Sequence, residues 1–570
     1  MTRNRGSTCG EWKMGNQRAA TDPRSSIGTW YPTTDSNRVP LFEAIEDVAN
    51  SWVILRDSSG ELSASRCGNI EFSPVEVPPS AARSTDNEGF PIICWLPQCR
   101  PSSLGSREFL HDHGVRNCYV AGSMANGIAS VEFVSALARE GCLSFYGSAG
   151  QSPAVVSAAV QRLKETVPGR PWGCNLIHSP QEPTSEDEIS RMLVREQVAC
   201  VEASAYLDVT APLVRLRIQG LSQDGSGRPF ARIRVMAKAS RLEVARRFLS
   251  APPEALVTQF LNSGEITPQQ AQWARMFPLC DDLTAEADSG GHTDNRPMAT
   301  LVPAFGRLRD EIARELPATS NVKIGAAGGL GTPDSIASAF ALGADYVLIG
   351  SVHQGCIESG SSDPVRQMLA EVGPADVIMA PASDMFELGV HLQVLRRGTL
   401  FGPRAKRLLE LYRNHNSIDE IPVSEKKRLE KDIFRMSLDD VWQLTQQFFI
   451  EREPAQIEKA VDDPHHQMAL IFRWYLGKSS DWANSGDPDR QLDYQVWCGP
   501  AMGAFNEWTK GTWLADPAAR CVGDISRALM HGAALSTRRE SLRRQGVSVA
   551  LDPSPRRIAA TYSTLLGTTT

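Results

Sequence analysis

The segment Val322–Gln354, VKIGAAGGLGTPDSIASAFALGADYVLIGSVHQ, contains two short apolar runs that end in small residues, with a helical pattern between them. No frame through it places glycine at every position of a G-x-G-x-x-G dinucleotide fingerprint. Gly328-Gly329 and Gly350-Ser351 instead follow two successive expected strands. Such a pair of loops is typical of strands seven and eight of a (β/α)8 barrel, where they often form a phosphate cup. The segment therefore predicts a barrel that binds a phosphorylated cofactor.

A regular alternation of strand and helix patterns precedes this segment, beginning near Asn117. Strand-like runs that end in small residues alternate with helical patterns of about 12 residues, which is typical of βαβ units. Eight such runs occur, in residues 118–127, 142–150, 172–180, 198–205, 230–240, 281–292, 322–331 and 345–351. The sequence thus predicts an α/β protein with a TIM barrel in residues 116–360. A helical insertion at 250–279 is a candidate lid over the top of the barrel.

The regions on either side of the barrel have different patterns. Residues 1–35 are polar and are expected to form a mobile lead-in, and residues 546–570 a flexible tail. Short helix and strand patterns separated by proline-rich turns predict a small α+β subdomain at 36–115. Residues 361–545 are chiefly helical and predict a C-terminal substrate- or carrier-binding domain that also serves as a lid.

The composition narrows the class of protein. The 570 residues carry a formal net charge of −7, which argues against general affinity for nucleic acid or an anionic membrane. No run of about 18 apolar residues is present and the first residues lack the apolar core of a signal peptide, so a cytoplasmic protein is expected. The twelve cysteines form no C-x-x-C pair and no zinc-ligand spacing, so we expect reduced, mostly buried thiols and no metal site.

Function in a barrel of this kind is built at the carboxyl ends of the strands. The sixth expected strand ends in Gly290-Gly291-His292, where the glycines let the backbone approach a flat ligand and the imidazole can transfer a proton near neutral pH. Asn175 could form paired hydrogen bonds to a pyrimidine-like edge, and Lys238 could place positive charge near a developing anion. Rim residues of these types also serve packing alone, and that alternative stays open for each of them.

Five tryptophans lie within 40 residues of the helical region. They form either a seam between domains or the wall of an apolar pocket. They are Trp474, Trp482, Trp497, Trp508 and Trp513.

Several long motifs strongly resemble the PfaD-type trans-acting enoyl reductases of polyketide and polyunsaturated fatty acid synthases, a group that belongs with FMN-dependent enoyl-ACP reductases and nitronate monooxygenases. The motifs are GSMANGIAS, NLIHSP, VEASAYLD, EADSGGHTDNRP, GAAGGLGTPDSIASAFALGADYVLIGS, APASDMFELGVHLQVLRRGTLF and MALIFRWYLG through CGPAMGAFNEW. The resemblance implies a bound FMN that is reduced by NADPH and passes a hydride to the β-carbon of an α,β-unsaturated thioester. Protonation at the α-carbon completes the reduction.

The resemblance also implies roles for particular residues. His292 would be the acid or the group that polarises the thioester carbonyl, and Lys238 is the second candidate catalytic residue. The barrel, 116–360, would bind FMN, and no metal is implied. The implied cofactor-binding residues are Met124, Ala125, Asn126, Gly147, Asn175, Lys238, Gly290, Gly291, Ala327, Gly328, Gly329, Gly350 and Ser351.

The implied partner is an acyl carrier protein of a synthase module, which would present the enoyl substrate on its phosphopantetheine arm. A basic stretch is a candidate docking face for this acidic carrier, although it could also be a solvated helix face. It consists of Arg396, Arg397, Arg404, Lys406, Arg407 and Arg413. Related proteins are often homodimers. Two alternatives remain: a nitronate monooxygenase and a noncatalytic flavin-containing scaffold that docks synthase modules.

Overall fold

A computed structural model describes residues 26–72, 89–180 and 182–549. The expected lead-in and tail fall largely on residues 1–25 and 550–570, which lie outside the described residues. The chain divides into two compact units. The smaller unit contains the described residues up to Pro101 and from His531 onward, and the larger unit is Ser102–Met530.

The smaller unit is built on a six-stranded antiparallel sheet with strand order β2-β4-β3-β6-β1-β5. The helix α1, Leu41–Glu46, and the last turns of α20, Val522–Arg544, pack against this sheet through an apolar core that includes Trp52, Ile54 and Leu542. Because β1 lies within residues 1–35, the ordered subdomain begins earlier than expected. The strands are β1 Gly28–Tyr31, β2 Arg38–Pro40, β3 Trp52–Arg56, β4 Leu62–Ser65, β5 Asn69–Glu71 and β6 Phe90–Leu96.

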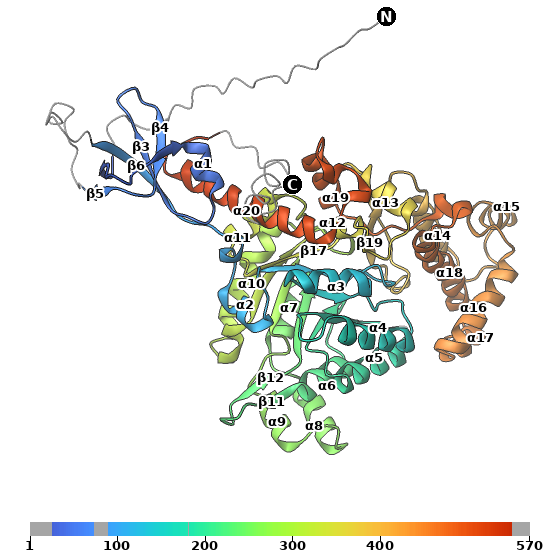
Figure 1. Ribbon diagram of the computed structural model, residues 1–570. Helices are drawn as coiled ribbons and strands as arrows, with labels where there is room; N and C mark the ends of the chain where they lie inside the picture. Colours follow the sequence, from blue (N-terminus) through green and yellow to red (C-terminus); the bar gives the residue numbers. More distant parts are fainter. Residues whose placement is uncertain (1–25, 73–88, 181, 550–570) are drawn as a thin grey trace, which may run out of the picture. The chain divides into compact units, whose positions relative to one another are not determined.

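The larger unit contains a closed parallel barrel with strand order β10-β13-β14-β16-β17-β7-β8-β9 (Figure 1). Each of the eight expected strand segments contributes one barrel strand, so the predicted TIM barrel is confirmed. Short apolar strands form here because a parallel barrel strand is covered on both faces. The strands are β7 Tyr119–Ala121, β8 Leu143–Tyr146, β9 Gly173–Ile177, β10 Cys200–Ser204, β13 Arg234–Ala239, β14 Asp282–Glu286, β16 Lys323–Ala327 and β17 Tyr346–Ile349.

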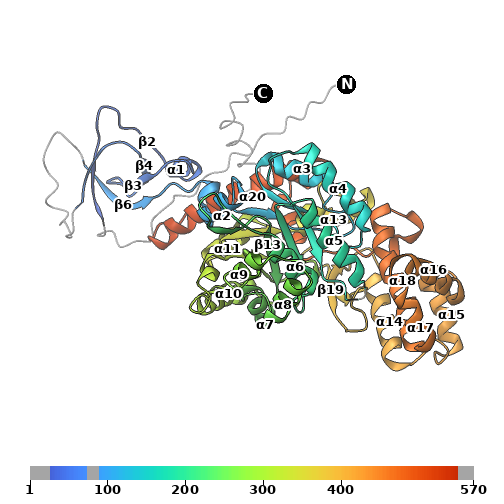
Figure 2. The ribbon, with the colours of Figure 1, turned by 90° about the horizontal axis from the view of Figure 1, so that it is seen from below.

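Helices surround the barrel, as Figures 1 and 2 show from two directions. Local signals fix their ends: Ser130 Oγ accepts a hydrogen bond from Phe133 N at the start of α3, and Gly141 ends that helix with a left-handed backbone at φ 72°. The helices are α2 Arg107–His113, α3 Val131–Glu140, α4 Pro153–Thr166, α5 Pro183–Arg195, α6 Ala211–Gln219, α7 Leu242–Leu249, α10 Met298–Ile312, α11 Pro333–Ala341, α12 Ser351–Gln354 and α13 Asp363–Ala370.

The helical insertion does not cover the top of the barrel. Its helices α8, Glu254–Asn262, and α9, Pro268–Ala274, follow α7, which has already returned the chain to the amino ends of the strands. They pack there against α6 and the hairpin β11–β12, Leu221–Gln223 and Pro229–Ala231 (Figure 1). The expectation of a lid at 250–279 is therefore wrong.

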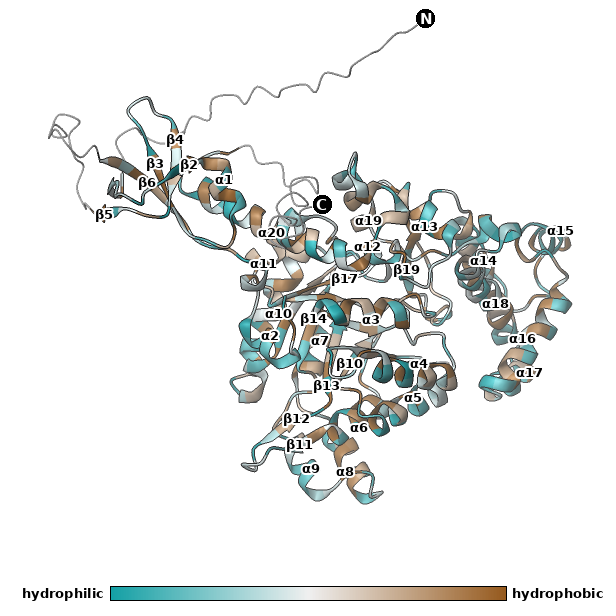
Figure 3. Cartoon of the chain, viewed as in Figure 1, coloured by the Kyte–Doolittle hydropathy of each residue, from teal (hydrophilic) through white to brown (hydrophobic). Residues whose placement is uncertain are grey.

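A helical lobe follows the barrel, with α14, α16 and α18 enclosing an apolar core that includes Phe401, Phe434, Phe472 and Tyr475. Figure 3 shows that the lobe helices carry both hydrophobic and hydrophilic residues, as expected for helices with one buried side. The helices are α14 Phe401–Asn414, α15 Val423–Arg428, α16 Leu438–Arg452, α17 Ala455–Asp462, α18 Pro464–Ser485 and α19 Pro500–Thr509.

A small antiparallel sheet of order β15-β19-β18 joins the barrel to this lobe. β15, Gly291–His292, comes from the loop after β14, whereas β18, Val377–Pro381, and β19, His391–Leu395, follow the barrel. The region expected to be chiefly helical thus also contains two strands, and they reach back to the predicted catalytic histidine.

Candidate active site

A cavity of about 410 Å³ lies at the carboxyl ends of the barrel strands. Its walls come from the loops after the strands and from α16, α18 and the start of α19. It brings together His292 and all but one of the predicted cofactor residues. Those in the wall are Met124, Ala125, Asn126, Asn175, Lys238, Gly290, Gly291, Ala327, Gly328, Gly329, Gly350 and Ser351.

Gly147 is the predicted cofactor residue that does not line this cavity. It packs behind the β7 loop, where its N–H donates to Ala129 O at 3.0 Å and a Cβ would overlap the carbonyl oxygen of Met124. Glycine is needed here for close approach of two backbones. The missing side chain lets the cavity-lining loop at 124–126 pack closely on the barrel, and direct contact of Gly147 with the cofactor stays a prediction.

Gly328 and Gly329 form a cradle at the end of β16. Both have left-handed backbones, with φ of 89° and 72°, and a Cβ on Gly328 would lie 2.7 Å from Asp288 N. A Cβ on Gly329 would meet no atom within 4 Å, so that side of the backbone opens onto free space. A cradle without side chains lets a phosphate approach the backbone, whose N–H groups can bind it.

The start of α19 closes this cradle from the other side. Ser351 Oγ accepts a hydrogen bond of 3.0 Å from Gly499 N, and Ala501 in the first turn of α19 lines the cavity. A Cβ on Gly331 would overlap the carbonyl oxygen of Ala501. The positive end of a helix dipole near the cradle adds to its attraction for an anion. Sequence reasoning missed this contribution, because the CGPAMG stretch stands out only as a family motif.

Glu202 on β10 is fully buried beneath the cavity. Its Oε2 accepts hydrogen bonds from the N–H and the hydroxyl of Ser123, whereas its Oε1 has no partner among the described residues. Asn175 Nδ2 donates to Ser204 Oγ at 2.8 Å and to the backbone oxygen of Glu202 at 3.1 Å. The Asn175 N–H groups are thus engaged within the protein, which differs from the paired contact expected with a ligand.

Lys238 on β13 points into the cavity with a side chain that is 12% exposed. Its Nζ lies 3.4 Å from Glu286 Oε1. Burial lowers the pKa of Lys238, but the carboxylates of Glu202 and Glu286 raise it by more, so the net pKa is above its ordinary value. Lys238 therefore remains a cation inside the site.

His292 reaches the cavity from β15 and pairs with a carboxylate that sequence reasoning missed. Its Nε2 lies 3.0 Å from Oδ1 of Asp384. Burial lowers the pKa of His292, and Asp384 raises it by charge and by hydrogen bonding, leaving it above its ordinary value. Burial raises the pKa of Asp384 in turn, but the His292 charge and hydrogen bond bring it below its ordinary value. The pair thus favours an imidazolium next to a carboxylate.

Aromatic residues of the helical lobe form the wall opposite the barrel, including Trp474, Trp497, Phe448 and Phe449. Trp482 instead packs edge-on against Trp474 with ring centroids 5.9 Å apart. Trp474 and Trp497 thus fit the pocket-wall interpretation, whereas Trp482 packs within the lobe and the seam between domains stays a prediction. At the same wall, Arg452 on α16 donates from Nη2 to Glu182 Oε2 at 2.8 Å, and this contact ties the lobe to the loop after β9.

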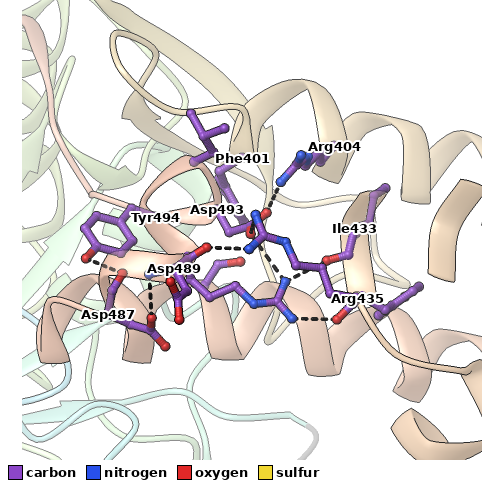
Figure 4. Close-up of polar contacts among 12 residues, drawn as sticks. Phe401, Arg404, Ile433, Arg435, Asp487, Asp489, Asp493 and Tyr494 are labelled. Carbon is purple, nitrogen blue, oxygen red and sulfur yellow. Dashed lines mark hydrogen bonds and ion pairs between the residues drawn. The ribbon is translucent and has the colours of Figure 1, made fainter. Parts of the chain in front are cut away.

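The expected basic docking face is partly wrong. Figure 4 shows Arg404 pointing at Asp493, a fully buried carboxylate. Asp493 also accepts a hydrogen bond of 2.8 Å from the hydroxyl of Tyr475 and forms an ion pair with Arg490 at 3.3 Å. Arg404, whose side chain is 16% exposed, is therefore engaged with the interior of the lobe. Arg407 is exposed but pairs with Glu425 at 2.8 Å, which neutralises part of the remaining face.

No group of three potential metal ligands occurs among the described residues. No described helix is long and apolar enough to cross a membrane. Most of the described cysteines are buried and none is paired in a disulfide.

The fold and the site were compared with those of known proteins. Residues 108–397 match the family model of nitronate monooxygenase. Over 78% of its length the chain is 37% identical to the enoyl reductase domain of MlnA from the macrolactin biosynthesis cluster of Bacillus amyloliquefaciens, with a TM-score of 0.73 and 99% of that structure covered. This chain belongs to the PfaD-type enoyl reductases of the nitronate monooxygenase family. The resemblance seen in the sequence motifs is confirmed.

Other relatives of this PfaD-type chain are longer proteins. It is 43% identical to a subunit of the polyunsaturated fatty acid synthase of Thraustochytrium sp. over 78% of its own length, and 42% identical to the polyketide biosynthesis protein PksE of Bacillus subtilis over 75%. It spans 30% of the first relative and 56% of the second. Residues 415–494 match the inserted helical domain of [acyl-carrier-protein] S-malonyltransferase. The family is one of flavin-dependent oxidoreductases, related to components of polyketide and polyunsaturated fatty acid synthases.

Proposed function

We propose that this protein is an FMN-dependent enoyl reductase that uses NADPH to reduce the α,β-double bond of acyl thioesters carried on a separate acyl carrier protein. The observation that carries the proposal is the position of the His292–Asp384 pair. It lies at the rim of a cavity that has a side-chain-free anion cradle on one side and an aromatic wall on the other. A flat phosphorylated ring and an acyl chain need these two surfaces together.

The residues present fit FMN. Gly328 and Gly329 would hold its phosphate with their backbone, aided by Ser351 and the first turn of α19. Oε1 of Glu202 is a buried acceptor with no partner among the described residues, and a Cβ on the cavity-lining Gly122 would lie 3.5 Å from it. Lys238 would offset negative charge on the ring system. The bound flavin supplies two-electron chemistry that no protein side chain provides.

His292 is the proposed proton donor to the α-carbon. Because Asp384 raises its pKa, the imidazole keeps its proton to a higher pH than an ordinary histidine, and the hydrogen bond to Asp384 fixes the orientation of its ring. The aromatic wall of Phe448, Phe449 and Trp474 excludes water from the space beside it.

A carrier protein of a synthase module is the proposed partner. The similarity to synthase subunits and to the helical insert of a malonyltransferase named for its acyl-carrier-protein substrate supports this partner. The residues of the expected basic face other than Arg404 stay candidates for docking, and a homodimer stays a proposal.

A nitronate monooxygenase is the second candidate, favoured by the family model that matches residues 108–397. Such an enzyme would use the same histidine on a small nitronate and would not need the aromatic wall of the lobe. A noncatalytic flavin scaffold would need neither His292 nor its partner carboxylate.

The test is steady-state turnover with analysis of the product. The purified protein is incubated without oxygen with NADPH and a crotonyl group on a carrier protein, and the acyl group is released and identified by mass spectrometry. A butyryl product that depends on protein and NADPH supports the reductase. Oxygen-dependent consumption of a nitronate with no butyryl product would assign the second candidate, and neither activity would favour the scaffold.

A further inference from the structure

Arg473 on α18 is a nearly buried cation in the wall of the active-site cavity. Its side chain is 8% exposed, and its guanidinium stacks over Phe449 at 5.7 Å from the ring centroid. Among the described residues it has one hydrogen-bonding partner, Glu387, whose Oε1 lies 3.5 Å from Nη1. The remaining N–H groups of Arg473 have no hydrogen bond within the described chain.

This is a costly arrangement for a buried arginine. The guanidinium has five N–H donors, and burying a charged group stabilises a protein only when those donors are satisfied. Arg217, which is also buried, shows the usual solution: it donates to Pro278 O at 3.0 Å and to both carboxylate oxygens of Asp281 at 2.6 and 3.2 Å. Arg473 instead has donors with no partner in the described chain, and because the residue lines the cavity, an oxygen of a ligand can accept from them.

Arg473 is held close to the His292–Asp384 pair by one loop. Residues 382–390, between β18 and β19, carry both Asp384, which contacts His292 from the barrel, and Glu387, which contacts Arg473 from the lobe. The charge of Arg473 contributes to the lowered pKa of Asp384, which places the two groups within electrostatic reach. The imidazole and the guanidinium thus line the same cavity, one from the barrel side and the other from the helical lobe.

We propose that Arg473 binds the thioester carbonyl oxygen of the acyl substrate and stabilises the negative charge that it gains during reduction. This inference rests on the proposed function. A bound flavin would supply the hydride that the β-carbon gains; the electron pair of the double bond then moves toward the α-carbon and the carbonyl oxygen, giving an enolate. Transfer of a proton from His292 to the α-carbon restores the carbonyl and leaves a saturated thioester. Arg473 donates hydrogen bonds throughout and is not consumed.

The test is a binding measurement that requires no turnover. The oxidised flavoprotein is titrated with the N-acetylcysteamine thioester of crotonate and with the matching crotyl thioether, which lacks the carbonyl oxygen, and binding is followed by the flavin spectrum. We expect the wild type to bind the thioester about tenfold to a hundredfold more tightly than the thioether, as a charged hydrogen bond allows. Arg473→Gln should remove this preference and Arg473→Lys should keep part of it.

Glu387→Gln is the matched control, because it removes the partner of Arg473 and leaves the guanidinium in place. The carbonyl preference should persist in this variant. Flavin content and the melting temperature of each variant show whether it is folded, and if Arg473→Gln does not fold, the comparison of Arg473→Lys with Glu387→Gln decides.

Three outcomes would overturn the inference: equal wild-type binding of the two ligands, a preference unchanged in the folded Arg473 variants, or loss of the preference in Glu387→Gln as well. A preference that depends on Arg473 in a protein that never reduces the crotonyl group would instead sustain the binding site and contradict the proposed function.

Discussion

Nε2 of His292 lies 3.0 Å from Oδ1 of Asp384, although 92 positions separate the two residues in the sequence. The contact exists because β15 pairs with β19, with His292 opposite Leu392, and this pairing positions the loop that carries Asp384 beside the barrel rim. The post-barrel segment thus completes a site that the barrel begins.

Removing the carboxylate should slow proton transfer from His292. In Asp384→Asn, burial still lowers the pKa of His292 and the charge that raised it is gone, so the imidazole loses its proton at lower pH. Stopped-flow rates of the acyl half-reaction should fall, with the alkaline limb of the pH profile displaced toward acid. His292→Ala should cost more, about a hundredfold or greater, as expected for loss of a general acid. An unshifted pH profile in Asp384→Asn would show that Asp384 does not tune this histidine.

The same pair makes stability depend on pH. The folded-state pKa of His292 is raised above 6.5, so its contribution to stability is complete below the unfolded pKa and is lost as pH rises through the folded value. The contribution of Asp384, whose folded pKa is lowered, is present above 3.8 and is lost as pH falls through the folded value. Denaturant unfolding should therefore show a larger gap between wild type and Asp384→Asn at about pH 6 than at about pH 9. In a His292→Gln background this pH dependence should disappear.

The glycine cradle should be needed for cofactor retention. Gly329→Ala places a methyl group in the open space of the cradle and strains a left-handed backbone by about 1 kcal/mol. Gly169→Ala is a matched control with φ of 69°, no atom within 4 Å of its Cβ and no part in the cavity. We expect both variants to lose similar stability and only Gly329→Ala to be purified with less flavin, measured by absorbance after denaturation. Equal flavin content would mean that the phosphate binds elsewhere.

Arg404 should matter for folding and not for carrier docking. Arg404→Ala removes a partner of the fully buried Asp493 and should lower the free energy of unfolding by about 3 kcal/mol. Arg407→Ala, on the same helix, removes an exposed pair and should cost less than about 1 kcal/mol. Urea titration of both variants measures this difference. Similar small losses of stability in both variants would show that Arg404 behaves as a surface residue and does not stabilise the fold through Asp493.

Local patterns were sufficient to predict the barrel and much of its rim. Strands buried on both faces appear as short apolar runs, and backbones that approach a ligand require glycine, so β16, Gly328 and the His292 turn were visible in the sequence. The lid at 250–279 was wrong because helix pattern alone does not reveal at which end of the barrel a connection lies.

The missing parts of the site depend on contacts between distant segments. Asp384 and Arg473 belong to regions whose relation to His292 is set by the small sheet and by packing of the lobe, which no local periodicity encodes. Arg404 shares a basic stretch with exposed Arg407, and charge alone does not distinguish the residue that pairs with a buried carboxylate from the exposed one. The sequence does not reveal that the missing side chain of Gly147 makes room for the backbone of Met124.

The most direct test of the account is the acyl half-reaction, isolated from NADPH and oxygen. The flavin is photoreduced under anaerobic conditions, mixed with crotonyl-loaded carrier protein and followed by its absorbance, with wild type and His292→Ala compared. We expect the oxidised flavin band to return in step with formation of one butyryl group per flavin, and this return to be slow in His292→Ala. A flavin that stays reduced with crotonyl carrier and is reoxidised only when oxygen or a nitronate is added would contradict it.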